Sequence, residues 1–159
     1  MNQQIRETTF ASIWQAIKDG KNFFIAGHQN PDGDSLGCTL TMVSLLSRLG
    51  KNPYAYATPA IGADLQFLPG LNNIHVNQLP QNPAFDTVIL LECSDRTRGG
   101  DLESVLKNAK TIINIDHHLI SDEYGHINYI DSSASSTAEI IFQLFEANEE
   151  GLLPTPDEA

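Results

Sequence analysis

Histidines and carboxylates fall in two short segments of the 159-residue sequence, at a spacing that suits divalent metal ions. The first segment is His28-x-x-x-Asp32-x-Asp34, and the second is Asp116-His117-His118. Imidazole nitrogens and carboxylate oxygens are ligands of borderline and hard ions such as Mn²⁺, Mg²⁺ or Zn²⁺. Two carboxylates on one short loop can contact two adjacent ions. The pattern therefore favours a metal site.

Each segment also has a purely structural interpretation. Asp32 and Asp34 could be a turn aspartate and the N-cap of a helix that starts near Ser35, because both roles favour Asp. In the second segment, one histidine could pack in the core while Asp116 caps a turn. Two adjacent histidines beside an aspartate favour the metal interpretation there. The first segment alone leaves both interpretations open.

Glu92 closes an apolar segment and is followed by further polar residues. A carboxylate at the end of a buried strand needs a partner or a metal ion, unless it is exposed where the strand leaves the sheet. Asp95 and Arg98 could form a local surface pair, which would contribute little to stability. Cys93 has no second cysteine at zinc-ligand spacing, so packing is its better interpretation.

Short apolar segments predict strands, and longer amphipathic segments predict helices. The expected strands are 23–26, 53–58, 87–91, 111–115 and 127–130. The expected helices are 10–18, capped by Thr8 or Thr9, then 35–49, 102–109 and 136–147. The stretch 59–84 is expected to be looped, with one helical turn near 63–68. The end, 151–159, is expected to be a loop with room for a helix start after Pro156.

Strands alternate with helices along the chain, which predicts a three-layer α/β fold with a mostly parallel sheet flanked by helices. In such sheets the ligand site lies beyond the carboxyl ends of the strands. His28 and the two aspartates follow the first expected strand, Glu92 follows the third, and His117 follows the fourth. We therefore expect these side chains to converge at one edge of the sheet.

The composition limits the classes of function. The chain has 9 Lys and Arg against 20 Asp and Glu, a formal charge of −11. This balance argues against binding long nucleic acid through charge alone, although metal ions can invert the local charge. The length and a hydrophobic fraction of 41% suit one domain with a core. Two cysteines, a polar N-terminus and short apolar runs predict a reduced cytoplasmic protein without a membrane span.

Three segments carry a resemblance to a known family. Segment 27–37 (GHQNPDGDSLG) resembles the first motif of the DHH phosphoesterase superfamily, and 116–118 is similar to its name-giving third motif. Segment 130–139 (IDSSASSTAE) resembles the stretch after that third motif in the subgroup of oligoribonuclease and 3′-phosphoadenosine 5′-phosphate phosphatases, next to RecJ-like exonucleases. The resemblance extends from about Phe10 to the end and implies a Rossmann-like DHH domain.

The resemblance implies a two-metal site, usually for Mn²⁺, with Mg²⁺ as an alternative. It implies that His28 and Asp32 bind one ion and that Asp34 and His117 bind the other. Glu92 stands where the family has a bridging Asp, and it is one methylene longer.

The predicted site also includes Asp116, His118 and Arg98. His118 would contact a phosphate oxygen, and Asp116 would hold an imidazole in place. Both are therefore candidate catalytic residues, and His118 and Arg98 are candidates for binding the substrate.

The implied function is hydrolysis of short oligonucleotides or nucleotide phosphates. The alternatives are an inactive or partial DHH domain that binds metal or nucleotide, and a phosphoanhydride hydrolase of pyrophosphatase or polyphosphatase type. The residue between the two aspartates, Gly33, resembles the oligoribonucleases of the family more than its pyrophosphatases. The family has a fourth motif with another metal-ligating Asp and then a smaller substrate-binding domain. We therefore expect residues 1–159 to be the catalytic domain, cut before the fourth motif. A homodimer is compatible with the resemblance.

Overall fold

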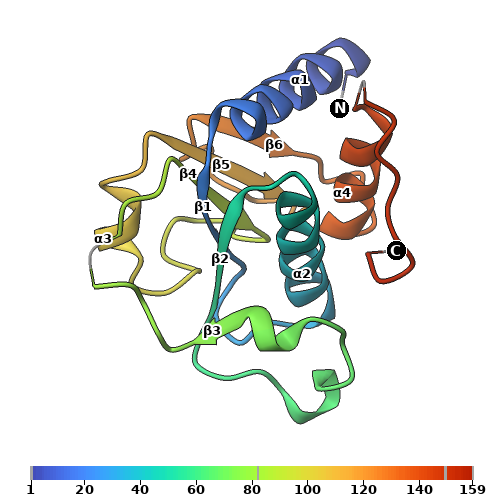
Figure 1. The fold of residues 1–159 in the computed structure, drawn as a ribbon. Coiled ribbons are helices and arrows are strands. Elements are labelled where there is room, and N and C mark those ends of the chain that lie inside the picture. Colours follow the sequence, from blue (N-terminus) through green and yellow to red (C-terminus); the bar gives the residue numbers. More distant parts are fainter. Residues whose placement is uncertain (1, 82, 149, 159) are drawn as a thin grey trace.

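The computed structural model describes residues 2–81, 83–148 and 150–158. Helices and strands alternate along most of the chain (Figure 1). The helices are α1 (Gln3–Asp19), α2 (Gly33–Arg48), α3 (Glu103–Leu106) and α4 (Thr137–Glu146), with short 3₁₀ helices η1 (Ala63–Leu65) and η2 (Leu71–Asn73). The strands are β1 (Asn22–Ala26), β2 (Asn52–Ala57), β3 (Ile74–Val76), β4 (Thr87–Leu91), β5 (Thr111–Asp116) and β6 (Ile127–Ile130).

The strands form one six-stranded sheet in the order β3-β2-β1-β4-β5-β6, and every neighbouring pair is parallel. The order reverses direction between β1 and β4, which is where ligands bind in open α/β sheets. Ala26 pairs with Leu90, and Leu91 pairs with Ile115. The carboxyl ends of β1, β4 and β5 are therefore level, and the residues that follow them meet at one edge.

The sheet is the middle of three layers, which confirms the predicted α/β fold. Helices α1, α2 and α4 cover one face, and of the α-helices in the described residues only the short α3 lies on the other (Figure 1). Successive strand residues point to opposite faces. Phe23, Ile25 and Ile89 accordingly join the core under the three long helices. Phe24, Val88 and Leu90 join a second core with α3. Because both faces are buried, these strands are apolar throughout.

Helix α1 begins much earlier than predicted. Its N-cap is Asn2, whose side chain accepts a hydrogen bond from the amide of Gln4, so the predicted caps Thr8 and Thr9 are wrong. Thr8 lies inside the helix and donates its hydroxyl to the Gln4 carbonyl at 2.8 Å. The first two turns are polar and exposed, so they carry no apolar period to detect. The predicted buried face is confirmed: Phe10, Ile13, Trp14 and Ile17.

Three smaller differences concern short elements. Strand β3 was not predicted, because three edge residues show too little alternation to stand out. Helix α3 covers four residues rather than 102–109. Residues 156–158 form a turn instead of a helix start, and residue 159 lies outside the described residues. None of these changes moves the edge of the sheet that carries the predicted site.

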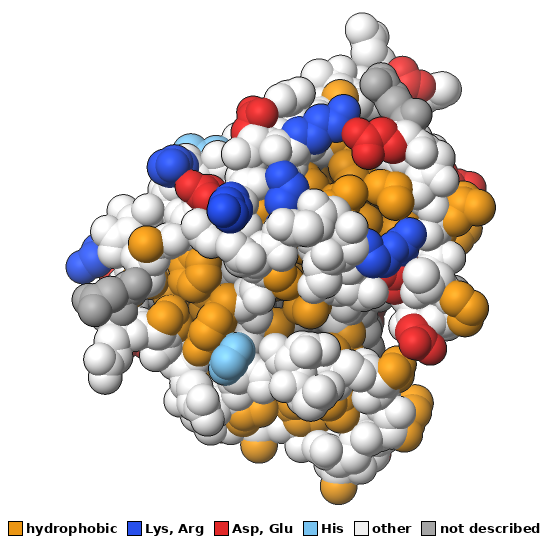
Figure 2. Space-filling model, viewed as in Figure 1, with side chains coloured by type: hydrophobic (Ala, Val, Ile, Leu, Met, Phe, Trp, Pro, Cys, Tyr) orange, Lys and Arg blue, Asp and Glu red, His pale blue; other side chains and the backbone are white. Residues whose placement is uncertain are grey.

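Basic side chains lie away from that edge on the face shown in Figure 2. Lys and Arg gather on its upper half, toward the amino ends of the strands, and acidic side chains lie among them. The lower half, toward the carboxyl ends, is largely apolar and neutral. Among the described residues, no helix is both long enough and apolar enough to cross a membrane.

Candidate metal centre

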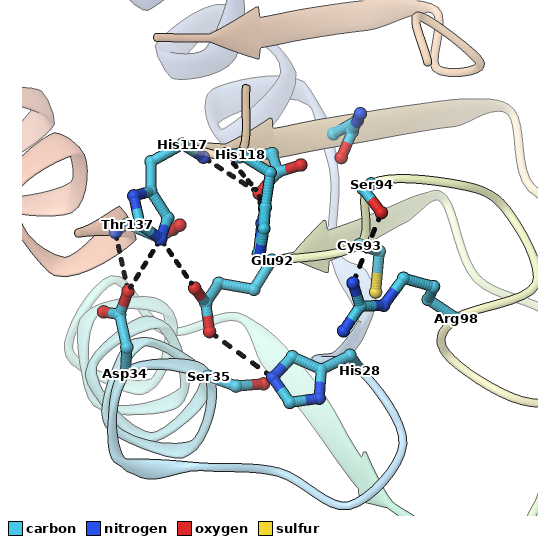
Figure 3. A network of polar contacts seen from close by, with 12 residues as sticks. His28, Asp34, Ser35, Glu92, Cys93, Ser94, Arg98, His117, His118 and Thr137 are labelled. Carbon is cyan, nitrogen blue, oxygen red and sulfur yellow. Dashed lines mark hydrogen bonds and ion pairs between the residues drawn. The ribbon is translucent and has the colours of Figure 1, made fainter. Parts of the chain in front are cut away.

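Glu92 lies at the centre of a polar cluster at the carboxyl ends of β1, β4 and β5. Its side chain is buried, and its two carboxylate oxygens face two imidazoles (Figure 3). Oε1 is 3.1 Å from His117 Nε2, and Oε2 is 3.6 Å from His28 Nε2. One carboxylate therefore joins histidines that follow β1 and β5. The interpretation of Glu92 as an exposed acid is wrong.

The backbone of Glu92 is unusual for a residue with a side chain. Its φ is +57°, in the left-handed region, and its amide donates to the Ile115 carbonyl at 3.0 Å. A non-glycine residue in a sparsely populated backbone region costs about 1–3 kcal/mol, and such residues cluster at functional sites. The chain therefore holds Glu92 in an unfavourable conformation at the point where β4 meets the polar cluster.

Asp32 caps a helix with one oxygen and turns the other toward His28. One oxygen, Oδ1, accepts a hydrogen bond from the Ser35 amide at 3.0 Å and caps helix α2. The other, Oδ2, lies 3.6 Å from His28 Nε2. Capping uses only one oxygen, so it leaves the second available at the site.

Asp34 points toward His117 but is not a helix cap of α2. Its Oδ2 is 3.9 Å from His117 Nε2 and accepts the amide of Thr137 at 2.7 Å. Its Oδ1 accepts the amide of Ala138 at 2.9 Å and lies 3.4 Å from the Cys38 thiol. The predicted proximity of Asp34 and His117 is thus present, together with contacts to α4.

His118 is held by Asp116. The Asp116 carboxylate is buried, and its Oδ1 lies 2.7 Å from His118 Nδ1. The same oxygen accepts the backbone amide of His117 at 2.9 Å. This arrangement leaves His118 Nε2 as the ring atom available to a ligand or substrate.

His28 and Glu92 face each other in a buried environment, and the pKa values of both are shifted. The contact with the Glu92 carboxylate raises the pKa of His28 above its usual value, against the opposing effect of burial. Burial raises the pKa of Glu92, although the contact with His28 opposes the rise. Burial also acts to raise the pKa of Asp32, but the Ser35 amide and the charge of His28 outweigh it, so that pKa is lowered.

Gly27 sets how closely the loop after β1 approaches helix α2. A Cβ built on Gly27 would lie 1.9 Å from Ser35 Oγ, a distance that no real contact allows. Ser35 is fully buried, and its Oγ has no hydrogen-bond partner. A Cβ at position 27 would therefore force a shift of Ser35 or of the loop carrying His28, which lies against the first turn of α2.

The residues present fit a divalent metal centre. Two groups offer ligand atoms that lie within 4.8 Å of one another: His28, Asp32 and Glu92 form one, and Glu92, His117 and His118 form the other. Glu92 belongs to both. Its buried Oε2 accepts no hydrogen bond. Across the described residues, only imidazoles lie within ion-pair distance of these site carboxylates. A bound cation would give Glu92 Oε2 a partner and would balance the negative charge of the site carboxylates.

The second group differs from the predicted ligand set. Sequence reasoning paired Asp34 with His117 as ligands of the second ion, whereas the close set contains His118 instead. Asp34 stays 3.9 Å from His117 and uses both oxygens to accept amides of α4. Its role as a ligand therefore stays a prediction.

Arg98 lies at the edge of the cluster, on the side of His28 (Figure 3). Its Nη1 lies 3.4 Å from Ser94 Oγ, and its carbonyl accepts the amide of Gln29 at 2.7 Å. The Asp95 carboxylate accepts hydrogen bonds from the amide and the hydroxyl of Thr97, at 2.7 and 2.6 Å, and the backbone amide and the charge of Arg98 also help to lower its pKa. Cys93 is buried in the second core, and burial raises the pKa of its thiol to about 12, as a packing role requires.

Sequence reasoning missed the contacts around the candidate ligand Asp34. The amides of Thr137 and Ala138 and the thiol of Cys38 all lie within hydrogen-bond distance of its carboxylate. The backbone contacts carry no signal in the sequence, because any residue except proline has an amide. The start of α4 was predicted at Ser136, which is its N-cap, but nothing linked it to Asp34.

Residues 22–159 match the family model described as the DHH family, N-terminal domain. The chain belongs to the DHH family. The resemblance of its three segments is thereby confirmed. In that family, the chain is 31% identical over 125 residues to the bifunctional oligoribonuclease and PAP phosphatase NrnA of Thermus thermophilus. It is 28% identical over 127 residues to a probable manganese-dependent inorganic pyrophosphatase of Staphylococcus epidermidis.

The alignments cover most of this DHH chain but a minority of each relative. They span 77% of this chain in both cases, and 36% and 40% of the respective relatives. Among solved structures, an exopolyphosphatase-related protein of Bacteroides fragilis superposes with a TM-score of 0.80 at 23% identity. That match covers 87% of this chain and 43% of the other, and it supports the fold. The chain thus spans about two fifths of the length of each of these three proteins.

Proposed function

We propose that this DHH chain is the catalytic domain of a two-metal phosphoesterase that hydrolyses short oligonucleotides or nucleotide phosphates. The observation that carries the proposal is the Glu92 carboxylate, which faces His28 with one oxygen and His117 with the other. A carboxylate shared between two groups of ligands suits two adjacent cations. The name of the Thermus relative supports this substrate class.

The metals would be held by the ligand groups around Glu92. His28 and Asp32 would hold one ion, and His117, with Asp34 or His118, would hold the other. Two divalent ions in such a site lower the pKa of a water molecule and neutralise the phosphate that it attacks. We propose Mn²⁺ as the ion, with Mg²⁺ as a substitute, because imidazole and carboxylate ligands suit both. The manganese-dependent relative supports Mn²⁺.

The protein's own groups would orient the substrate. Asp116 fixes the ring of His118 through Nδ1 at 2.7 Å, so that Nε2 can contact a phosphate oxygen. Arg98 at the edge of the cluster would bind a second phosphate oxygen through its planar guanidinium.

An efficient enzyme of this kind would also need contacts with parts of the substrate that lie away from the metal ions. Remote contacts between an enzyme and its substrate supply energy for orientation at the reacting atoms. A displacement near 1 Å can reduce a rate by about 10²-fold. We therefore propose that residues 1–159 alone turn over substrate weakly, and that a longer form with a substrate-binding domain is faster.

The test is hydrolysis of a substrate panel with Mn²⁺. The panel contains a dinucleotide, 3′-phosphoadenosine 5′-phosphate and pyrophosphate, assayed with this chain and with a longer form. We expect turnover of the first two that is lost in His117→Ala and kept in the surface control Asp19→Asn. Preference for pyrophosphate would favour a phosphoanhydride hydrolase. No turnover of any substrate by either form, despite Mn²⁺ binding, would leave a metal-binding module and overturn the proposed enzyme.

A further inference from the structure

Asp34 is attached to helix α4 by two backbone amides. Oδ2 accepts the amide of Thr137 at 2.7 Å, and Oδ1 accepts the amide of Ala138 at 2.9 Å (Figure 3 shows the first contact). The partners are 103 and 104 residues apart in the sequence. The carboxylate of one helix thus occupies the N-terminal end of another, beside the predicted metal centre.

The amides of Thr137 and Ala138 lie in the first turn of α4. The amides of the first turn of a helix have no acceptor within the helix. Ser136, the N-cap, accepts only the amide of Glu139, at 3.1 Å. Thr137 and Ala138 therefore need an outside acceptor, and Asp34 supplies it. The N-terminal end of a helix also carries partial positive charge, which attracts a carboxylate.

The two hydrogen bonds fix the direction of the carboxylate. Each amide holds a different oxygen, so a rotation of the Asp34 side chain would break both. The oxygen held by Thr137 is the one that lies 3.9 Å from His117 Nε2. Thr137 itself is fully buried, and its own hydroxyl has no hydrogen-bond partner. The backbone amide of Thr137 is therefore its polar contact with the site.

We propose that Thr137 is a positioning residue: its amide, with that of Ala138, keeps the Asp34 carboxylate directed at His117 while a metal ion binds. The inference rests on the proposed function, in that it takes the His117 side as a metal site. Groups that orient metal ligands typically contribute 10–100-fold to metal affinity. The start of α4 is accordingly part of the metal centre, although it offers no ligand atom.

Amide hydrogen exchange in the unmodified chain tests this directly. The exchange rates of the Thr137 and Ala138 amides are measured by NMR without metal and with saturating Mg²⁺, which is diamagnetic. We expect both amides to stay at least as protected with Mg²⁺, and to lose protection in Asp34→Ala. A tenfold or greater loss of protection on adding Mg²⁺ would mean that Asp34 leaves α4 to bind metal, which overturns the proposal.

A proline at position 137 removes one of the two amides. Thr137 is the first helical residue of α4, a position that proline favours, and Ser136 already has the extended backbone that precedes proline. Thr137→Val keeps the amide and the shape of the side chain. We expect Thr137→Pro to bind Mn²⁺ at least 10-fold more weakly than Thr137→Val, measured by calorimetry. Equal affinities of these two variants would overturn the proposal.

Gln3→Pro is the matched control, because Gln3 is the first residue of α1 and is remote from the site. It should bind Mn²⁺ like the unmodified chain. If Thr137→Pro does not fold while Gln3→Pro does, the exchange experiment decides. If the unmodified chain binds neither Mn²⁺ nor Mg²⁺, the proposed function fails. In that case the loss of amide protection in Asp34→Ala still reports the Asp34–α4 contact separately.

Discussion

Asp32 and His28 contact each other at 3.6 Å, through the one Asp32 oxygen that does not cap helix α2. The cap fixes the side chain at the first turn of the helix, and the second oxygen faces the imidazole. The cap thus uses one atom of the carboxylate, and the proposed metal contact would use the other. Substitutions that separate these atoms can test each role by itself.

Asp32→Asn and Asp32→Ala should differ in stability but not in metal response. Asn caps helices about as well as Asp, whereas Ala loses about 1 kcal/mol. In chelator we therefore expect the unfolding free energy of Asp32→Asn to match the unmodified chain within about 0.5 kcal/mol, and that of Asp32→Ala to fall by about 1 kcal/mol. A ligand at 100 times its Kd stabilises by about 2.7 kcal/mol, and both variants should lose much of that gain with Mn²⁺. Urea unfolding measures both quantities. A full Mn²⁺ gain in Asp32→Asn would exclude Asp32 as a ligand.

Glu92→Gln should stabilise the metal-free protein and abolish its response to Mn²⁺. Burial raises the pKa of Glu92, which means that the ionised form is unfavourable in the folded state at neutral pH. Removing this charge while keeping the shape should therefore raise the unfolding free energy in chelator. Thermal unfolding with and without Mn²⁺ is the measurement, with the exposed Glu7→Gln as control. Destabilisation in chelator together with an intact Mn²⁺ shift would contradict the assignment of Glu92.

Gly27→Ala should destabilise the fold through a single contact. The new Cβ would meet Ser35 Oγ at 1.9 Å, and such overpacking costs about 1–3 kcal/mol. Adding Ser35→Gly should recover most of that loss, which gives a favourable coupling of about 1 kcal/mol or more. Gly37→Ala is the control, because nothing lies within 4 Å of its Cβ and alanine favours a helix interior. Additive effects of the changes at 27 and 35 would show that the strain lies elsewhere.

Asp86 lies at the amino end of β4, away from the candidate metal centre, and should make the stability of the protein depend on pH. The hydrogen bond from Lys110, at 2.8 Å, and the amides of Asn22 and Lys21 hold the pKa of Asp86 well below its usual value. A lowered folded-state pKa gives stability that is present above the unfolded pKa of about 3.9 and is lost as the pH falls through the folded value. The loss of stability in Asp86→Asn should therefore be constant from about pH 7 to pH 5 and shrink below about pH 4. Urea unfolding across this range tests it, and a difference that does not change with pH would contradict it.

The sequence predicted the elements that bury apolar side chains and the edge where the polar ones meet. The four-residue apolar run before Gly27 and the run Thr87–Leu91 are strands, because a strand buried on both faces must be apolar throughout. Since all the strands are parallel, the residues after them converge, as expected for His28, Glu92 and His117. These parts of the site depend on local pattern and on one general rule of topology.

The remaining features depend on tertiary contacts. The first turns of α1 are polar, and Ile5 is 56% exposed, so the pattern that marks a buried helix begins only at Phe10. The left-handed backbone of Glu92 could not be inferred, because glutamate has no preference for it. The close set of His118 with Glu92 depends on distances of a few ångströms, which spacing along the chain does not determine.

The contact between Asp34 and α4 also has a consequence for the time at which the site forms in a growing chain. Ribosomes add about 5–20 residues per second, so the 103 residues between Asp34 and Thr137 take roughly 5–20 s to synthesise. Throughout that interval the His28, Asp32 and Asp34 segment has neither the amides of α4 nor, for most of it, His117. Strand β1 also cannot pair with its neighbour β4 until β4 has been synthesised. In the nascent protein, the loop with His28, Asp32 and Asp34 is therefore exposed well before the other residues of the candidate metal centre have been synthesised.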